Sequence, residues 1–250
     1  MHEVRPVGTE LDATLLGVAD GLGQVLGFDH GVRAGIWHQP ARAEDPPQAA
    51  HLAHHLPHCE RHLELQPPAF DLDSDAAPNY GDTGGTVGHE LTHGFDDEGR
   101  QFDAQGNLRD WWTPEDGKEF QKRADCISNQ YSSYTIIDDI KINGKLTLGE
   151  DVADLGGVLL AYMAWKQDTK DQKLQPLDGL TPEQRFFVGY GQSWCGQSRD
   201  ETKRLRATVD PHSPEKYRTN GVVSNMPEFQ QAFHCKAGSA MVNQNRCRVW

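Results

Sequence analysis

The pattern of hydrophobic and polar positions divides this chain into two regions of unlike character. Proline, alanine and histidine crowd into residues 34–62 without a sustained helical or strand period. Later in the chain, apolar residues recur at helical spacing between turn-rich joints at residues 66–68 and 143–144. The pattern therefore predicts an irregular, poorly folded segment over residues 1–64 and an ordered, mainly helical domain over residues 65–250.

One predicted helix begins near Leu148 and has two distinct faces. Glu150 and Asp154 lie four positions apart, so both carboxylates point the same way. Two adjacent glycines, Gly156 and Gly157, leave room for another helix to approach closely. A separate apolar stripe consists of Leu148, Val152, Leu155 and Leu159.

Length and charge limit the classes of protein to which the chain can belong. Its 250 residues can bury a substantial core, in one large domain or two small ones. The 37 acidic and 24 basic residues give a net charge of −13, which repels phosphate backbones and anionic membranes, so nucleic acid is not expected as a partner. The longest apolar run, residues 15–28, contains Asp20 and is shorter than the roughly 20 residues that cross a bilayer. Residues 1–6 show no export signal.

The five cysteines are widely separated along the chain. They are Cys59, Cys126, Cys195, Cys235 and Cys247. None forms a C-x-x-C pair, which disfavours a zinc ribbon or a thioredoxin-like redox site. Dispersed cysteines suit the long-range disulfides of an exported protein, and the odd number leaves at least one thiol unpaired. Buried free thiols are the alternative interpretation.

A histidine-rich tract at residues 50–59 is the first candidate for metal binding. Imidazoles three or four positions apart meet on one face of a helix. Pro57 interrupts such a helix, and histidine-rich stretches are more often solvated. We therefore favour a solvated tract and keep a histidine-rich metal-storage protein, binding through residues 51–62, as an alternative.

The H-E-x-x-H pattern at residues 89–93 carries the strongest chemical signal. On a helix, His89 and His93 lie one turn apart and can direct imidazole nitrogens at one ion. Glu90 lies beside that face, where a carboxylate can act as a general base on water without being a ligand. Two imidazoles and a carboxylate at three corners of a tetrahedron suit Zn²⁺.

The surroundings of this pattern favour a metal site over a surface helix that carries the same residues by chance. Residues 80–85 form a plausible helix entry, and carboxylates at residues 96–98 could accept the outer N–H of a ligand histidine. Glu150 is the best candidate for the third ligand, with Asp154 orienting a histidine. Thr147 and Glu150 also fit a capping box, in which Glu150 only satisfies backbone N–H groups. That alternative leaves Asp154 and the two glycines unexplained.

Together these motifs resemble the neprilysin-like zinc endopeptidases, a family that includes endothelin-converting enzymes and bacterial relatives. The resemblance covers about three quarters of the chain. It implies a mainly α (α+β), thermolysin-like catalytic domain and an extracytoplasmic location, whether periplasmic, secreted or membrane-anchored. The matching stretches are residues 65–68, 79–81, 89–100, 143–157, 210–221 and 247–250.

The resemblance also implies a role for each matching residue. The ligands of one Zn²⁺ are His89, His93 and Glu150, with Asp96 and Asp154 behind them. The catalytic residues are Glu90, His212, which stabilises the oxyanion, and Asp154. The substrate contacts are Arg218, which grips a carbonyl, and Trp194 and Phe70, which make the specificity pocket apolar. From the residues alone, Ser213 caps a helix that begins at Pro214 and stops at Gly221.

Several departures from the family pattern stand out. The family's large helical N-terminal domain and its Asn-Ala-x-Tyr strand have no counterpart in residues 1–64. We therefore expect a fragment or a frame-shifted upstream reading, with a missing domain or another chain as a partner. Thr86 stands where the family usually has an apolar residue lining the specificity pocket, and Ala69 replaces an aromatic one.

The resemblance further implies the disulfide pairing. Cys126 pairs with Cys247, whereas Cys195 and Cys235 bond to cysteines of the N-terminal domain in the family. Because those partners have no counterpart here, we expect Cys195 and Cys235 to remain thiols on a surface that the domain would cover.

The sequence thus predicts a zinc endopeptidase that hydrolyses peptides on the amino side of hydrophobic residues. A catalytically impaired zinc-binding fragment that acts as a binding module is the alternative. About one firmly held zinc ion per chain fits either of these, whereas several weakly held ions would indicate the metal-storage protein.

Overall fold

The computed structural model describes residues 67–109 and 111–250, which form a mainly helical unit, as expected. Residues 1–64 lie outside this part, so their predicted irregularity stays a prediction. None of the described helices is long and apolar enough to cross a bilayer. The elements are α4 (Ala76–Asn79), α5 (Gly85–Thr92), α6 (Pro114–Ser132), β1 (Thr135–Ile137), β2 (Ile140–Lys141), α7 (Leu148–Asp168), α8 (Pro182–Ser193), α9 (Asp200–Val209), α10 (Glu215–Val223) and α11 (Pro227–Ala232).

The helix that carries the H-E-x-x-H pattern begins earlier than expected. Asp75 caps α4 by accepting a hydrogen bond from a backbone N–H, and a π-helical turn at Tyr80–Gly84 joins α4 directly to α5. We expected residues 80–85 to begin the helix, but they lie inside the continuous helical segment formed by α4, the π-helical turn and α5. Glycine is needed there because a Cβ on Gly81 would lie 2.1 Å from the Phe186 carbonyl oxygen of α8. The predicted helix start was wrong because the clustered glycines allow neighbouring helices to pack closely.

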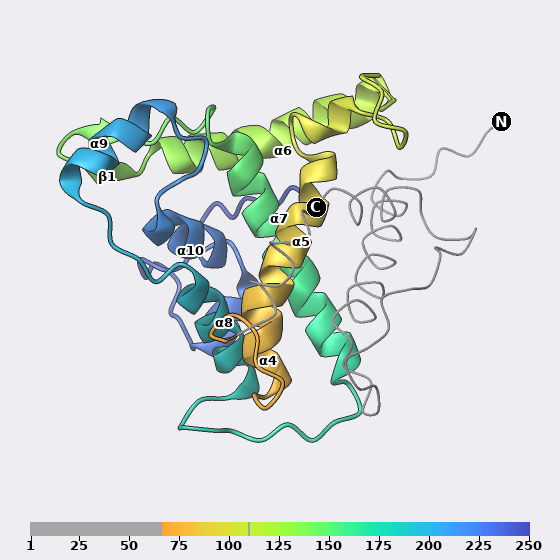
Figure 1. The fold of residues 1–250 in the computed structure, drawn as a ribbon, viewed down its shortest axis with the longest axis vertical. Helices are drawn as coiled ribbons and strands as arrows, with labels where there is room; N and C mark the ends of the chain where they lie inside the picture. The colour runs from red at the N-terminus through yellow and green to blue at the C-terminus, as the bar shows by residue number, and fades with distance from the viewer. Residues whose placement is uncertain (1–66, 110) are drawn as a thin grey trace.

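Helices α5 and α7 cross at the centre of the molecule (Figure 1). A Cβ on Gly157 of α7 would lie 2.3 Å from the His89 backbone nitrogen, and one on Gly88 of α5 would lie 2.5 Å from the Gly157 carbonyl oxygen. Gly156 faces the side chain of Thr92, and a Cβ there would lie 2.7 Å from Thr92 Cγ2. The expectation that the glycine pair admits another helix is confirmed, and that helix is the one bearing the histidines.

The core is built around α7, whose apolar stripe is buried as predicted. Burying one large apolar side chain stabilises a fold by roughly 1.5–3 kcal/mol. Outside the helices, β1 and β2 form an antiparallel two-stranded sheet, against which α9 packs. Fully buried large side chains include Tyr80, Ile127, Tyr131, Trp165, Phe186 and Met226.

A disulfide joins α6 to the C-terminal segment. Cys126 and Cys247 are bonded with a Cα–Cα distance of 5.5 Å, which confirms the predicted pairing. Next to it, Trp250 packs against Phe120, with ring centroids 5.7 Å apart. Cys195 and Cys235 are free thiols, also as predicted. The C-terminal segment is thereby held against α6.

Candidate metal centre

Three side chains from α5, its C-terminal end and α7 converge on one point. The ligand atoms of His89, His93 and Glu150 lie within 4.8 Å of one another. The two histidine Nε2 atoms are 2.9 Å apart, and Glu150 oxygens lie 3.3 Å from His89 Nε2 and 3.5 Å from His93 Nε2. Two imidazole nitrogens and one carboxylate are a donor set that zinc accepts.

The opposite ring nitrogen of each histidine faces a buried carboxylate. His89 Nδ1 lies 2.8 Å from Asp154, and His93 Nδ1 lies 2.6 Å from Asp96. Asp96 is itself fixed, because its other oxygen accepts the backbone N–H groups of Glu98 and Gly99. Carboxylates in these positions orient both rings and leave the Nε2 lone pairs directed at the shared point. The residues therefore fit a zinc ion.

Charges in this cluster shift the pKa values of its members. Burial lowers the pKa of His89, but contacts with Asp154 and Glu150 outweigh burial and raise it to about 9. Burial raises the pKa of Glu150 and Asp154, but the opposing contacts with His89 and Arg218 prevail, and both end below their usual values. In the metal-free chain a protonated His89 and Arg218 together balance the two carboxylates, and a bound cation would take over the role of the His89 proton.

The capping box proposed for Glu150 does not form. The Thr147 hydroxyl lies 2.7 Å from Asp151 Oδ2 and makes no capping hydrogen bond to the α7 backbone. Glu150 is therefore free of the helix end and turns towards the histidines. The sequence could not decide whether Glu150 caps the helix or is a metal ligand, because Thr147 stands at the N-cap in either case.

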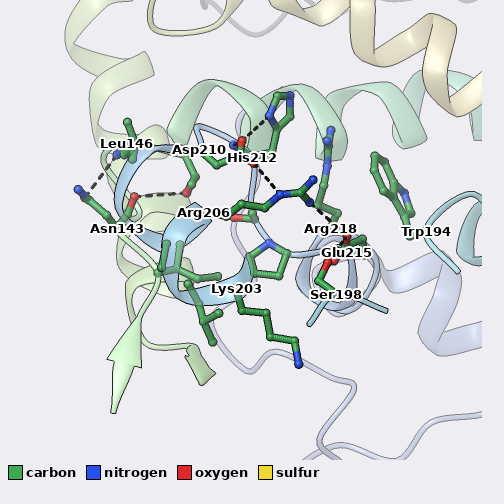
Figure 2. Close-up of a pocket in the computed structure, with 16 residues that line it drawn as sticks. Asn143, Leu146, Trp194, Ser198, Lys203, Arg206, Asp210, His212, Glu215 and Arg218 are labelled. Atoms are coloured by element: carbon green, nitrogen blue, oxygen red, sulfur yellow. Dashed lines mark hydrogen bonds and ion pairs between the residues drawn. The ribbon is translucent and has the colours of Figure 1, made fainter. Parts of the chain in front are cut away.

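His212 approaches the same cluster from the loop between α9 and α10. Its Nδ1 donates to Asp210 at 2.8 Å, and its Nε2 lies 3.3 Å from a Glu150 oxygen. Asp210 also lies 3.6 Å from Arg206, which lies 3.7 Å from Glu215, so a chain of contacts runs from His212 into α9 and α10 (Figure 2). The side chain of His212 is 49% exposed, so this arm faces solvent.

The helix after His212 differs from its predicted bounds. Pro214 is its N-cap rather than its first residue, and Ser213 makes no capping hydrogen bond. The helix also continues past Gly221 to Val223. A Cβ on Gly221 would lie 2.6 Å from the Tyr131 hydroxyl, so this glycine serves close packing instead of helix termination.

Arg218 from α10 joins the buried carboxylates to an aromatic ring. Its Nε and Nη2 each donate to Asp154 at 2.7 Å, and Nη2 also donates to Glu150 at 3.2 Å. Its guanidinium carbon lies 4.0 Å from the ring centre of Trp194. Nη1 makes no hydrogen bond within the described part of the chain. Arg218 thus lies at the cluster, where it binds Asp154 and Glu150 and keeps one donor group, Nη1, for a ligand.

A cavity of about 230 Å³ adjoins the cluster, beside His212, Trp194 and Arg218 (Figure 2). Its wall also includes apolar side chains from the two-stranded sheet and the following loop, among them Ile142. Phe70 is not among the lining residues of this cavity. Its other lining residues include Ile136, Leu146, Lys203, Arg206 and Ala207.

Comparison with known protein families identifies the family of this chain. The profile of Peptidase family M13 matches residues 62–249. The chain belongs to this family. Neprilysin-1 of Caenorhabditis elegans is 50% identical to it over 192 residues, which cover 74% of this chain and 26% of that protein. Endothelin-converting enzyme-like 1 of Homo sapiens is 41% identical over 212 residues, which cover 82% of this chain and 27% of that protein. The resemblance to neprilysin-like enzymes is thereby confirmed.

A solved structure supports the same fold. The zinc metalloprotease ZMP1 of Mycobacterium tuberculosis, in complex with an inhibitor, superimposes with a TM-score of 0.71 at 42% identity. The match covers 74% of this chain and 29% of that chain. This M13 chain therefore has the fold of a zinc metalloprotease catalytic domain and spans a little over a quarter of the length of these relatives.

Three residues of this M13 site received no role from the sequence. Asp210 accepts a hydrogen bond from His212, and Arg206 forms an ion pair with Asp210. Asp151 accepts a hydrogen bond from the Thr147 hydroxyl. Asp210 lies two residues before His212, the spacing of an Asx turn, and could have been found from that pattern. Arg206 is four positions before Asp210 at the end of a helix, which is a weaker signal. Asp151 is indistinguishable from a solvated acidic residue by sequence alone.

Proposed function

We propose that this chain binds one zinc ion through His89, His93 and Glu150 and hydrolyses peptide bonds on the amino side of hydrophobic residues. The observation that carries the proposal is the convergence of two Nε2 atoms and a carboxylate, with a second carboxylate behind each histidine. Membership of a peptidase family supports the reaction class. Hydrolysis by a chain of this length is part of the proposal.

Each side chain has a distinct task in this reaction. A zinc ion held by His89, His93 and Glu150 would supply Lewis-acid chemistry, polarising the scissile carbonyl and lowering the pKa of water. Glu90 takes a proton from that water and delivers it to the leaving amine; it is half-buried on α5 and has no hydrogen bond or ion pair to another described residue. His212 with both ring nitrogens protonated donates from Nδ1 to Asp210 and from Nε2 to the developing oxyanion. The free Nη1 group of Arg218 contacts a substrate carbonyl.

Hydrophobic specificity is supported by the apolar part of the cavity wall, with Trp194 at one side. A preference for an apolar side chain follows, because burying it there removes apolar surface from water. Phe70 and Thr86 remain predicted contributors to a specificity pocket. A further domain or a second chain that completes substrate binding also stays a prediction.

We place the protein outside the cytoplasm. Support comes from the disulfide between Cys126 and Cys247, because disulfides persist in oxidising compartments. A relative from Mus musculus, 46% identical over 192 residues, is called Membrane metallo-endopeptidase-like 1, which points the same way.

The test compares a base variant with ligand variants. Glu90→Gln is expected to retain about one zinc per chain and to lower hydrolysis of a quenched fluorescent peptide by about 10²–10⁴-fold. Glu150→Ala and His89→Ala are expected to lose zinc. Full zinc occupancy in Glu150→Ala, with loss in His89→Ala, would refute Glu150 as the third ligand.

The same measurements test the binding-module alternative. Zinc bound at one per chain by the unaltered protein, without any hydrolysis across a set of peptides with hydrophobic residues, would favour a non-catalytic binding module. Such a module should still capture a peptide carrying a zinc-binding hydroxamate, and Glu150→Ala should abolish that capture.

A further inference from the structure

The first turn of α7 leaves no room for a side chain at Gly149. This glycine stands directly before Glu150, the proposed third ligand of the metal. A Cβ on Gly149 would lie 3.0 Å from Asp97 Oδ1 and 3.2 Å from Asp96 Oδ2. Both distances are shorter than the 3.4–4 Å of an ordinary van der Waals contact. An added methyl group would therefore press on two carboxylates at once.

Asp96 cannot yield to such a methyl group without weakening one of its own contacts. Its side chain is buried, and its Oδ2 lies 2.6 Å from His93 Nδ1. Its Oδ1 accepts the backbone N–H groups of Glu98 at 2.9 Å and Gly99 at 2.7 Å. Any rotation or shift of the carboxylate therefore lengthens at least one of these three hydrogen bonds.

The segment that carries Asp96 is also held by its backbone. A Cβ on Gly99 would lie 1.7 Å from the His93 carbonyl oxygen, so this segment already touches the end of α5. Asp97 Oδ1 is buried without a hydrogen-bond partner among the described residues, and it fills the space over Gly149. Close packing on both sides therefore opposes a retreat of this segment from α7.

We propose that Gly149 is a positioning residue, whose missing side chain lets Asp96 lie against α7 and hold the His93 ring towards the metal. It sets the separation between this carboxylate and the turn of α7 that carries Glu150. The inference rests on the proposed function, in which His93 and Glu150 bind zinc. Gly149 acts through Asp96 and touches no reacting atom.

The first measurement is the zinc affinity of the full chain, obtained by competition with a chromophoric chelator. Gly149→Ala should raise the Kd for zinc by about tenfold to a hundredfold, the usual cost of disturbing a carboxylate behind a ligand histidine. Alanine favours a helix more than glycine does, so the urea midpoint of the metal-free chain should stay close to that of the unaltered protein. A weaker zinc site in an equally stable chain distinguishes positioning from general damage.

The second measurement is the nitrogen–proton NMR correlation of the His93 ring in the metal-free chain, assigned with His93→Ala. The signal should shift in Gly149→Ala. Gly94→Ala is the matched control: Gly94 directly follows His93, but a Cβ on it would meet nothing within 4 Å. This control should keep both the His93 signal and the zinc affinity of the unaltered protein.

A double-mutant cycle tests whether Gly149 acts through Asp96. Asp96→Ser shortens the side chain and keeps one oxygen that can accept a backbone N–H. In that background, Gly149→Ala should weaken zinc binding by less than about twofold more. In the background of Asp97→Ser it should still weaken zinc binding by about tenfold. If Gly149→Ala alone does not fold, its combination with Asp96→Ser should fold, because the shorter side chain makes room.

Zinc affinity in Gly149→Ala within about twofold of the unaltered protein overturns the proposal, and so does an unchanged His93 signal. An equal loss in Gly94→Ala, or a full loss that persists beside Asp96→Ser, also overturns it. Where the single variant does not fold, a combined variant that also fails, although Asp96→Ser folds, has the same meaning. Absence of zinc-dependent hydrolysis in the unaltered chain counts against the proposed function alone, because the zinc affinity and the NMR signal are measured without turnover.

Discussion

The crossing of α5 and α7 and the loop that carries His212 contribute to one site but are held in different ways. At the crossing, glycines bring two backbones together, and the histidine rings are backed by carboxylates at 2.6 and 2.8 Å. The loop reaches the site through a half-exposed ring, and Arg206 supports it at 3.6 Å from Asp210. Backbone contact fixes the proposed metal ligands, whereas side-chain contacts position His212, the proposed oxyanion donor.

This difference predicts different consequences of substitution. A change at the crossing should reduce folding and zinc binding together, because the same atoms support both. A change in the loop should reduce turnover and leave the free energy of unfolding nearly constant, since exposed residues contribute little to the core.

The largest effect is expected for Gly157→Val. The new Cβ would lie 2.3 Å from the His89 nitrogen and 2.8 Å from the Gly85 carbonyl, and backbone atoms cannot move aside as a flexible side chain can. We expect a loss of more than about 4 kcal/mol in unfolding free energy, or no folded protein, together with loss of zinc. Urea unfolding and metal analysis measure both.

Gly117→Ala is the matched control, because its added Cβ would meet only Arg100 Nη1 at 3.7 Å. It lies in α6 and should be neutral or slightly stabilising. Folded Gly157→Val with normal zinc content would show that the crossing tolerates separation, and the contrast between the two regions would disappear.

The next effect concerns the disulfide. Cys126→Ser with Cys247→Ser opens a loop of 121 residues and should cost roughly 3–5 kcal/mol if the chain-entropy account holds. Zinc content of the folded fraction should stay normal, because the bond joins α6 to the C-terminal segment and none of the proposed ligands lies in either. Replacing the free thiols Cys195 and Cys235 by serine should change unfolding by much less. Equal losses in the two double variants would contradict the assignment.

The sequence predicted which side chains converge better than it predicted where the helices begin. His89 and His93 are recoverable because helical spacing places them on one face, and Asp154 follows from the same reasoning one turn after Glu150. The start of the histidine helix was missed because glycine was taken as a helix entry. Gly81 is needed inside this helix because α8 approaches its backbone, and that contact is invisible in local sequence.

The supports of the site were also hard to predict, for a related reason. Asp154 and Arg218 are separated by a long stretch of chain and meet only after α7 and α10 pack together. Periodicity reports which face of a helix is apolar but not which distant guanidinium a buried carboxylate will meet. Resemblance supplied the pairing of Cys126 with Cys247, which spacing alone left open.

A middle-sized effect on turnover is expected for His212→Ala. Removing a donor aimed at the oxyanion should lower kcat by about 10²–10³-fold, or roughly 3 kcal/mol of transition-state stabilisation. Unfolding free energy should change by less than about 0.5 kcal/mol, because the ring is half exposed. Steady-state kinetics and urea unfolding measure the two quantities. Equal damage to turnover and to binding of a short substrate would make His212 an ordinary loop residue.

The smallest effect is expected for Arg206→Gln, which tests whether the ion pairs behind Asp210 matter at all. Exposed ion pairs contribute at most about 1 kcal/mol, so kcat/KM should fall by about twofold to fivefold. Arg204→Gln is the control on the same helix: its partner Asp138 lies at 2.9 Å but has no connection to His212, so kcat/KM should not change. Because salt screens such pairs, the difference between Arg206→Gln and the unaltered protein should shrink at about 1 M salt. A salt-independent loss would instead mean that Arg206 holds the loop by packing its apolar stem in the cavity wall, and the loop would then resemble the α5–α7 crossing more closely than its exposure suggests.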